Sequence, residues 1–353
     1  MYAAILAGGS GRRFWPASTL GRPKQFLDIT GRGTMLSLTR RRLSGILPPE
    51  RILVLTALDH ALMVRKELPD IPEENIFAEP VSRNTAPSLA VAAAMVLEKG
   101  GDEPLLCCPS DHLITGDGSF EGAVETAARA ASSRDVLVTF GIRPSHPATG
   151  YGYIETGGRL EEGVLEAASF REKPDRSTAM SFLESGRHYW NSGIFMWRPT
   201  VFLDAWDRFL PSGREPIGRI MEACRDGEAL DPVASGCYSD MPSVSVDYGI
   251  LERASNVVVV PADFGWSDVG SWDALEGIVP SDGSGNSVVG DSTAIDSKGN
   301  IFYNPEGFTA AIGVEGIIVA VSGGSVLVCR KGESQKVRDL LDRMEEENRD
   351  GLL

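Results

Sequence analysis

The chain has 353 residues, of which 42% are hydrophobic and 24% are charged, a composition typical of a globular protein with one large and one smaller domain. Acids outnumber bases by 49 to 34, and the formal net charge is -15. This balance excludes a broad nucleic-acid-binding surface, so an anionic ligand must be bound by a local cluster of basic residues.

Strand-like and helix-like segments alternate along the first 140 residues. Apolar runs that suit buried parallel strands lie at 3–6, 52–56, 75–78, 104–108 and 135–140. Helical patterns lie between them, at 34–46, 58–68, 86–97 and 120–131. The alternation predicts an α/β domain with a doubly wound, mostly parallel (Rossmann-like) sheet, whose ligand site lies at the carboxyl ends of the strands.

The pattern changes after residue 148. Hairpin-like pieces at 151–156 and 164–174 precede helices near 177–185 and 199–209, and we expect this region to cover the open end of the sheet. Short strands without intervening helices follow at 283–331, and an amphipathic helix is predicted over 335–344. We therefore predict a catalytic domain over 1–280 and a small all-β domain with a terminal helix over 281–353.

The five cysteines show no paired CxxC spacing, and neighbouring Cys107 and Cys108 lie in a strand-like run. We interpret them as core residues, neither disulfides nor zinc ligands. No apolar run approaches the roughly 18 residues of a membrane span, and Met1 leads directly into a strand. A cytoplasmic location is predicted.

The stretch LAGGSGRRFWPASTLGRPKQF (6–26) is rich in glycine and cations. Glycines directly behind a strand allow backbone N–H groups to approach a phosphate, although a plain glycine-rich turn is the alternative. The spacing fits neither a Walker loop nor GxGxxG. Arg13 and Lys24 favour a polyphosphate ligand over a pair of solvated surface charges.

This loop resembles the signature loop of the sugar-1-phosphate nucleotidyltransferases, with Arg12 where most members have Thr. The later motifs are similar to those of mannose-1-phosphate guanylyltransferases: EPVSRNTAPSLAVAA (79–93), CPSDHLI (108–114), TGYGYIE (149–155), FREKPD (170–175), YWNSGIFMW (189–197), SVDYGILERA (245–254) and FGWSDVGSWDAL (264–275). The C-terminal unit, with DSKGNIFYN and SQKV, resembles that family's short β-helix domain.

The resemblance implies transfer of GMP from GTP to α-D-mannose 1-phosphate, with pyrophosphate as the leaving group. A guanylyltransferase for another sugar 1-phosphate, such as glucose or a heptose, is the nearest alternative. A GDP-sugar glycosyltransferase would require a DxD pair where this chain has DH, and a non-catalytic nucleotide sensor is a further alternative. The chain stops where bifunctional relatives continue, so we expect no isomerase activity.

The reaction requires cations around two polyanions. By resemblance, Arg13 and Lys24 bind the β- and γ-phosphates, and Lys173 binds the attacking sugar phosphate, although an exposed ion pair with Glu172 is an alternative for Lys173. The nucleotide is expected to contact the loop at Leu6, Ala7, Gly8, Gly9 and Gly11.

Two carboxylates are predicted to hold Mg²⁺ together with substrate oxygens. Asp111 follows a buried strand at the carboxyl edge of the sheet, and Asp268 is the matching carboxylate by resemblance. An aspartate in a loop is also a common turn former. Strand alternation turns His112 away from the metal position, which indicates a structural histidine.

The remaining assignments concern the base and the sugar. Glu79 can accept both the N1–H and the N2–H₂ of guanine together, which favours guanine. Asn84 and Thr85 are candidates for base or ribose contacts, although Thr85 is equally the N-cap of the following helix. Glu172 and Asn191 suit sugar hydroxyls, and Gly150 with Tyr151 suits close approach of the hexose or an ordinary turn. The sequence leaves open whether the protein is a homodimer.

Overall fold

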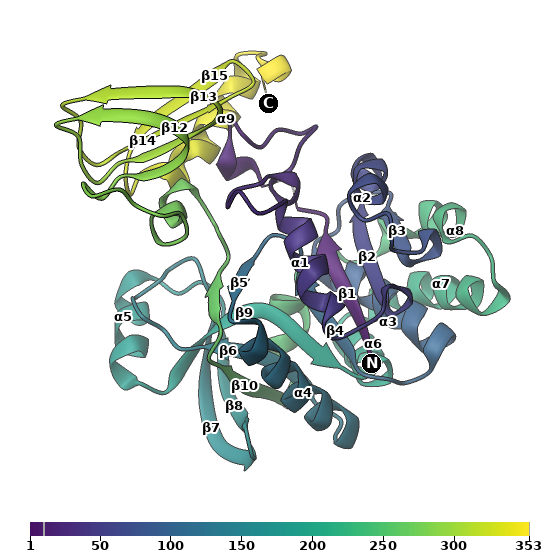
Figure 1. The fold of residues 1–353 in the computed structure, drawn as a ribbon. Helices are drawn as coiled ribbons and strands as arrows, with labels where there is room; N and C mark the ends of the chain where they lie inside the picture. Colours follow the sequence, from purple (N-terminus) through teal and green to yellow (C-terminus); the bar gives the residue numbers. More distant parts are fainter. Residues whose placement is uncertain (10, 353) are drawn as a thin grey trace. The chain divides into compact units, whose positions relative to one another are not determined.

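The computed structural model describes residues 1–9 and 11–352. Its contacts divide the chain into two compact units that do not follow the order of the sequence (Figure 1). The first unit comprises Met1–Gly8, Arg40–Ser110 and Ile114–Trp266. The second comprises Gly9–Thr39, Asp111–Leu113 and the chain from Ser267 onward. Most of the glycine-rich loop therefore belongs to the same unit as the C-terminal β region.

A nine-stranded sheet forms the centre of the described part of the first unit, in the order β3-β2-β1-β4-β9-β6-β10-β8-β7. Its strands are β1 (Tyr2–Ala7), β2 (Ile52–Ala57), β3 (Ile76–Glu79), β4 (Leu105–Pro109), β6 (Leu137–Ile142), β7 (Tyr153–Glu161), β8 (Val164–Arg171), β9 (His188–Trp197) and β10 (Val257–Ala262). β1 pairs in parallel with β2 and β4, and β2 pairs in parallel with β3. This half confirms the predicted doubly wound arrangement.

The other half of the sheet corrects the prediction for the region after residue 148. The β7–β8 hairpin pairs with β9 and β10, so it extends the sheet instead of covering its open end. β9 lies antiparallel between β4 and β6, while β10 pairs in parallel with β6. Sequence analysis predicted neither β9 nor β10 as a strand. The segment of β9 was interpreted only as a motif, and the apolar run of β10 was overlooked.

The helices that connect these strands along the chain are α1 (Met35–Ser44), α2 (Ala61–Glu67), α3 (Thr85–Gly100), α4 (Asp117–Ser133), α5 (Arg176–Ser185), α6 (Pro199–Phe209), α7 (Arg214–Asp226) and α8 (Leu230–Cys237). The small alanines of α3 let it lie buried in the main core, where residues of α6 and α7 such as Trp206 and Ile220 join it. The sequence analysis did not predict α7 and α8, in which proline and glycine interrupt the helical pattern.

The second unit contains a sheet in the order β12-β13-β14-β15, formed by β12 (Ser287–Ile295), β13 (Ile301–Ile312), β14 (Ile317–Ser322) and β15 (Ser325–Arg330). The first three strands stack in parallel, as coils of a β-helix do, and β15 pairs antiparallel with β14. The helix α9 (Val337–Glu346) follows, close to its predicted position. Strands β5 (Leu113–Thr115) and β11 (Gly265–Ser267) form a separate pair.

Aromatic residues tie the glycine-rich segment into the core of the second unit. The Phe14 ring centroid lies 4.9 Å from that of Trp272, which in turn lies 4.8 Å from Tyr303 on β13. The Trp272 Nε1–H donates to the carbonyl of Trp15 at 3.0 Å. Leu341 of α9 belongs to the same core. The loop is therefore anchored by packing on residues far along the chain.

Cys107, Cys108 and Cys237 are buried, as predicted for core residues, whereas Cys224 and Cys329 are only partly buried; all five cysteines are free thiols in this structure. Among the described residues, we find no helix with the length and apolar character that crossing a bilayer requires.

Two buried asparagines connect successive turns of the β-helix. The Nδ2 of Asn300 donates to Asn286 Oδ1 at 2.9 Å and to the carbonyl of Val314 at 3.0 Å. Its Oδ1 accepts from the backbone N–H of Ile317 at 3.0 Å. Because Asn300 is 1% exposed, water cannot replace these partners without a change in structure.

We expect Asn300→Ala to lower the free energy of unfolding by about 2–4 kcal/mol. The change leaves the buried backbone carbonyl of Val314 and N–H of Ile317 without their hydrogen-bond partner. Denaturant titration followed by tryptophan fluorescence measures the loss. Lys298→Ala in the same turn is the control, since its 3.4 Å ion pair with Glu315 is exposed and contributes little. Equal losses in the two variants would contradict the structural role of Asn300.

Candidate active site

Lys24 is the centre of the polar cluster in the second unit. Its side chain is buried, and its Nζ lies 2.8 Å from Asp111 Oδ2. The same ammonium donates to the backbone carbonyl of Asp268 at 2.6 Å. Gly11, in the left-handed region with φ 58°, packs against this lysine, and a Cβ there would lie 2.2 Å from the Lys24 Cβ. The structure thus brings together one cation and both aspartates predicted to bind metal.

Asp111 lies just after β4, at the carboxyl end of the strand. Burial raises the pKa of its carboxyl group, but the charge of Lys24, the proximity of His112 and the Lys24 hydrogen bond outweigh this effect. The net pKa of Asp111 is lowered, so the group is ionised at neutral pH. A carboxylate in this state can bind a hard cation.

Asp268 lies in a tight loop, in which its carboxylate lies close to the backbone of Gly270. The next residue, Val269, has φ 45°, and a Cβ on Gly270 would lie 2.7 Å from Asp268 Oδ2. Carboxylate and carbonyl oxygens are suitable ligands for a hard divalent cation. No group of three or more His, Cys, Asp or Glu that could hold a metal occurs within the described residues. Two carboxylates fit an ion such as Mg²⁺, which usually keeps waters or substrate oxygens as further ligands.

Two adjacent arginines of the loop, Arg12 and Arg13, contact the C-terminal segment. Arg13 Nη1 donates to Gln335 Oε1 at 3.1 Å. Arg12, the departure from the family pattern, forms an ion pair with Glu345 of α9, and its Nη1 lies 3.9 Å from Asp342 Oδ1. Arg12 therefore connects the loop to α9 in this structure.

In the first unit, the end of β1 lies beside Glu79 at the end of β3. The Leu6 carbonyl accepts from Ser110 N–H at 3.0 Å, and the Ala7 carbonyl accepts from Thr56 Oγ1 at 3.1 Å. A Cβ on Gly8 would lie 2.9 Å from Glu79 Oε2. Among the described residues, chain neighbours aside, no atom lies within 4 Å of the equivalent position on Gly9. The structure thus brings Gly8 and Glu79 together, as a base-binding role requires.

Glu79 is buried, with 8% of its surface exposed. Its Oε1 accepts hydrogen bonds from the hydroxyl groups of Ser88 and Tyr238. Burial raises the pKa of Glu79, and the two hydroxyl donors lower it in part. Tyr238 was missed in the sequence analysis, because nothing in its local pattern connects it with Glu79, 159 residues away.

Asn84 and Thr85 start α3, and the structure corrects one interpretation. Asn84, with φ 67°, is the N-cap of the helix, and its Oδ1 accepts from Thr85 N–H at 2.9 Å. Thr85 is inside the helix, where its Oγ1 accepts from Val246 N–H at 3.0 Å. Asn84, not Thr85, therefore caps the helix, because its amide reaches the free backbone N–H. A contact of either residue with the nucleotide stays a prediction.

Lys173 and Glu172 form a pair just after β8. Lys173 lies in the left-handed region with φ 43°, and its Nζ lies 2.9 Å from Glu172 Oε1. Burial lowers the pKa of Lys173, but the adjacent Glu172 more than compensates and the net pKa is raised. Glu172 Oε2 is buried without a hydrogen-bond partner among the described residues, and a Cβ on Gly152 would lie 2.4 Å from it. An unpaired buried oxygen of this kind suits a ligand hydroxyl.

Asn191 on β9 is held by three hydrogen bonds. Its Oδ1 accepts from Thr139 Oγ1 at 3.0 Å and from Gly193 N–H at 3.2 Å. Its Nδ2 donates to Asp247 Oδ1 at 2.8 Å. The second hydrogen of the Asn191 amide can be donated to a ligand. The Asp247 carboxylate lies next to this amide.

Asp247 is a candidate functional residue that the sequence analysis missed. It begins a π-helical turn, Asp247–Leu251, a form frequent at functional sites. Burial, followed by the charge of Glu172, raises the pKa of Asp247 to about 6. The motif SVDYGILERA contained the signal, although its aspartate was assigned no role.

Tyr151 lies among aromatic residues. Its ring centroid is 5.1 Å from those of Trp190 and Trp266, in edge-to-face geometry. Gly150 is exposed, and apart from its chain neighbours no atom in the part of the chain that the structure describes lies within 4 Å of its Cβ position. A contact of either residue with a hexose stays a prediction.

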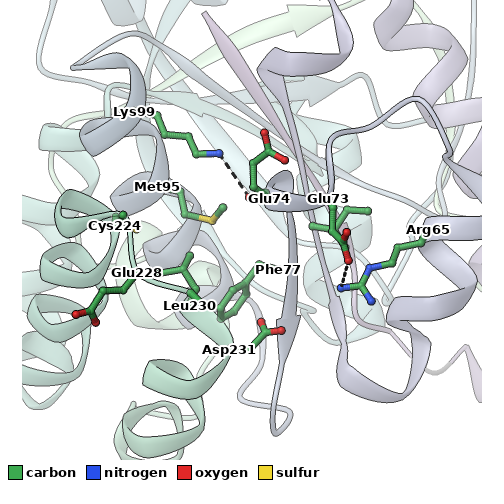
Figure 2. A pocket seen from close by; sticks show the side chains of 13 residues that line it. Arg65, Glu73, Glu74, Phe77, Met95, Lys99, Cys224, Glu228, Leu230 and Asp231 are labelled. Atoms are coloured by element: carbon green, nitrogen blue, oxygen red, sulfur yellow. Dashed lines mark hydrogen bonds and ion pairs between the residues drawn. The ribbon is translucent and has the colours of Figure 1, made fainter.

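A separate cavity of about 550 Å³ opens at the other end of β3 (Figure 2). Phe77, Met95 and Leu230 form its apolar part. Lys99 donates to the Glu74 carbonyl at 3.5 Å, and Arg65 lies 3.3 Å from Glu73. Because ligands of open α/β sheets bind at the carboxyl ends of strands, where Glu79 lies, this cavity is not the active site.

The sheet topology and the glycine-rich loop after β1 define a nucleotidyltransferase fold. Residues 2–283 match the nucleotidyl transferase family, whose members are typically metal-dependent. Residues 290–344 match the MannoseP isomerase/GMP-like β-helix domain family. With both matches in order, the chain belongs to the mannose-1-phosphate guanylyltransferase family.

The relatives support this placement. Mannose-1-phosphate guanylyltransferase of Escherichia coli is 37% identical over 350 residues, which cover 98% of this chain and 74% of the relative. The xanthan biosynthesis protein XanB of Xanthomonas campestris is 37% identical, over 98% of this chain and 73% of the relative. A crystal structure from Thermus thermophilus, described as a mannose-1-phosphate geranyltransferase, has a TM-score of 0.88 and 36% identity, covering 98% and 99% of the two chains.

The raised pKa of Asp247 predicts a pH-dependent gain in stability for Asp247→Asn. A carboxyl group whose pKa rises from 3.8 to about 6 on folding destabilises the protein once it ionises. This loss of stability is absent below about pH 4 and complete above the pKa that Asp247 has in the folded protein. We expect the variant to be more stable than wild type by about 1–3 kcal/mol at pH 7.5, with no gain at pH 4.

Calorimetric melting temperatures across this pH range measure the difference without interference from the ionisation of substrate phosphates. Asp240→Asn, at an exposed position, is the matched control. A stability difference that does not change with pH would contradict the raised pKa of Asp247.

Proposed function

We propose that this chain transfers GMP from GTP to α-D-mannose 1-phosphate and releases pyrophosphate, producing GDP-mannose. The observation that carries the proposal is the family match over both domains, at 37% identity to a mannose-1-phosphate guanylyltransferase across 98% of the chain. We assign the transfer to residues 1–280 and treat 281–353 as a β-helix-like accessory domain.

The chemical step is an attack of a sugar phosphate oxygen on the α-phosphorus of GTP, in line with the leaving pyrophosphate. The sugar phosphate is already an anion near neutral pH, so the enzyme needs no strong general base. Its main task is to neutralise charge with groups fixed in advance. Asp111 and Asp268 would hold a magnesium ion, which stabilises the charge on the α-phosphoryl group and pyrophosphate when bound.

The cations of the two units have separate roles in this proposal. In the second unit, Lys24 and Arg13 bind the β- and γ-phosphates, and the burial of Lys24 fixes its ammonium before substrate arrives. In the first unit, Lys173 binds the attacking phosphate, and its raised pKa keeps it charged at neutral pH.

The first unit also supplies the groups that recognise the base and the sugar. Glu79 reads guanine beside Gly8, where its Oε2 is directed at the loop. Glu172 accepts a hydrogen bond from a hydroxyl of mannose through Oε2, which has no hydrogen-bond partner among the described residues. Asn191 donates its remaining amide hydrogen to another hydroxyl.

We place the reaction in the cytoplasm, where a chain with five free cysteines stays reduced. The proposed chemistry uses residues of one chain.

Pyrophosphate release with a panel of substrates tests the assignment. We expect turnover with GTP and mannose 1-phosphate, and a much lower kcat/KM when glucose 1-phosphate or a heptose 1-phosphate replaces it. No turnover with GTP and mannose 1-phosphate would reject the proposed activity. Sugar transfer from GDP-mannose to an acceptor, without pyrophosphate, would favour a glycosyltransferase.

Asp111→Asn tests the metal-binding carboxylate. The change keeps the shape of the side chain but removes its charge, so we expect kcat to fall by about 10²–10⁴-fold with an unchanged circular dichroism spectrum. Asp117→Asn, at the exposed start of α4, is the matched control and should keep wild-type kcat. An unchanged kcat for Asp111→Asn at saturating magnesium would remove Asp111 from the metal site.

A further inference from the structure

The two carboxylate oxygens of Glu79 have different surroundings. Oε1 accepts from Ser88 on α3 and from Tyr238, which lies in the 3₁₀ turn after α8. A carboxylate oxygen has two lone pairs, so these two hydroxyl groups occupy Oε1. Oε2 is instead directed at Gly8, where a Cβ would lie only 2.9 Å away.

This arrangement changes how the carboxylate can recognise guanine. Simultaneous use of both oxygens would require Oε1 to accept a third hydrogen bond. The two lone pairs of Oε2 can instead accept the N1–H and the N2–H₂ of the base together. Base selection then depends on the orientation of one oxygen.

Tyr238 is well suited to fix that orientation. The residue is 0% exposed, and its ring centroid lies 6.0 Å from that of Phe77 on β3, so packing leaves the hydroxyl little freedom. Burial and the nearby Glu79 charge raise the pKa of Tyr238, so its hydroxyl stays protonated and always donates. Its hydrogen bond also favours the ionised form of Glu79, which is the form that accepts from guanine.

We propose that Tyr238 is a positioning residue for base selection, which holds Glu79 Oε1 so that Oε2 alone reads the guanine edge. The proposal rests on the proposed role of Glu79 in binding guanine. Tyr238 makes no contact with the nucleotide in this scheme. It acts by restricting the rotation of the carboxylate and by keeping it ionised.

Tyr238→Phe tests the proposal because it keeps the buried ring and removes only the hydroxyl. With mannose 1-phosphate as acceptor, we expect kcat/KM for GTP to fall about tenfold, mainly through KM, as for loss of a hydrogen bond to a charged group. Inosine triphosphate keeps the N1–H but lacks the exocyclic amino group. The preference for GTP over this analogue should therefore fall severalfold.

The pH profile separates positioning from a purely structural role. Loss of the hydroxyl raises the pKa of Glu79 further, so the rise in KM for GTP on acidification should begin at a higher pH in Tyr238→Phe than in wild type. Tyr303→Phe, which removes another buried tyrosine hydroxyl in the second unit, is the matched control. It should keep the wild-type selectivity and pH profile.

Two more variants make each outcome decisive. Ser88→Ala removes the other donor to Oε1 and should shift selectivity in the same direction, so it tests the geometry if Tyr238→Phe fails to fold. Glu79→Gln tests the underlying role, because unchanged selectivity in this variant would reject Glu79 as the base reader. Loss of selectivity in Glu79→Gln, with wild-type selectivity and pH profile in folded Tyr238→Phe, would overturn the positioning role alone.

Discussion

One buried ammonium group organises the polar cluster of the second unit. Lys24 attracts the Asp111 carboxylate at 2.8 Å and the Asp268 carbonyl at 2.6 Å, and Gly11 lies directly against its side chain. Three distant parts of the chain therefore meet at one charge. Because Lys24 is 4% exposed, water screens these attractions less than those of surface ion pairs. The glycine-rich loop and both aspartates are thus held together by one buried charge.

Three carboxylates of the candidate site each have one oxygen next to a glycine. Glu79 Oε2 lies beside Gly8, Glu172 Oε2 beside Gly152, and Asp268 Oδ2 beside Gly270, in each case where a Cβ would come within 3 Å. The other oxygen of Glu79 accepts from hydroxyl groups, and that of Glu172 pairs with Lys173. The protein thereby fixes one oxygen and leaves room around the other. A fixed acceptor loses less entropy when it binds a ligand.

The predictability of most elements follows the strength of the local signal, although the continuous apolar run of β10 was overlooked. The first strands and α3 were found because continuous apolar runs and alanine-rich helical patterns report burial directly. β9 was missed as a strand because Asn191, Ser192 and Gly193 interrupt its apolar pattern. Pro216 and Gly218 similarly obscure α7, whose stability comes from packing against α3. Tertiary contacts override weak local propensity in these elements.

The sequence alone determined the family and the α/β class, and it supplied most of the charged candidate residues, because motifs and hydrophobic periodicity are local properties. Only the tertiary structure decided which groups meet. It joined Gly9–Thr39 to the C-terminal β region, bound Arg12 to α9, and placed Asp247 beside Asn191. It also brought Tyr238 to Glu79 across 159 residues. Such contacts depend on how sheets and helices pack, and residues distant in sequence carry no local pattern that records their pairing.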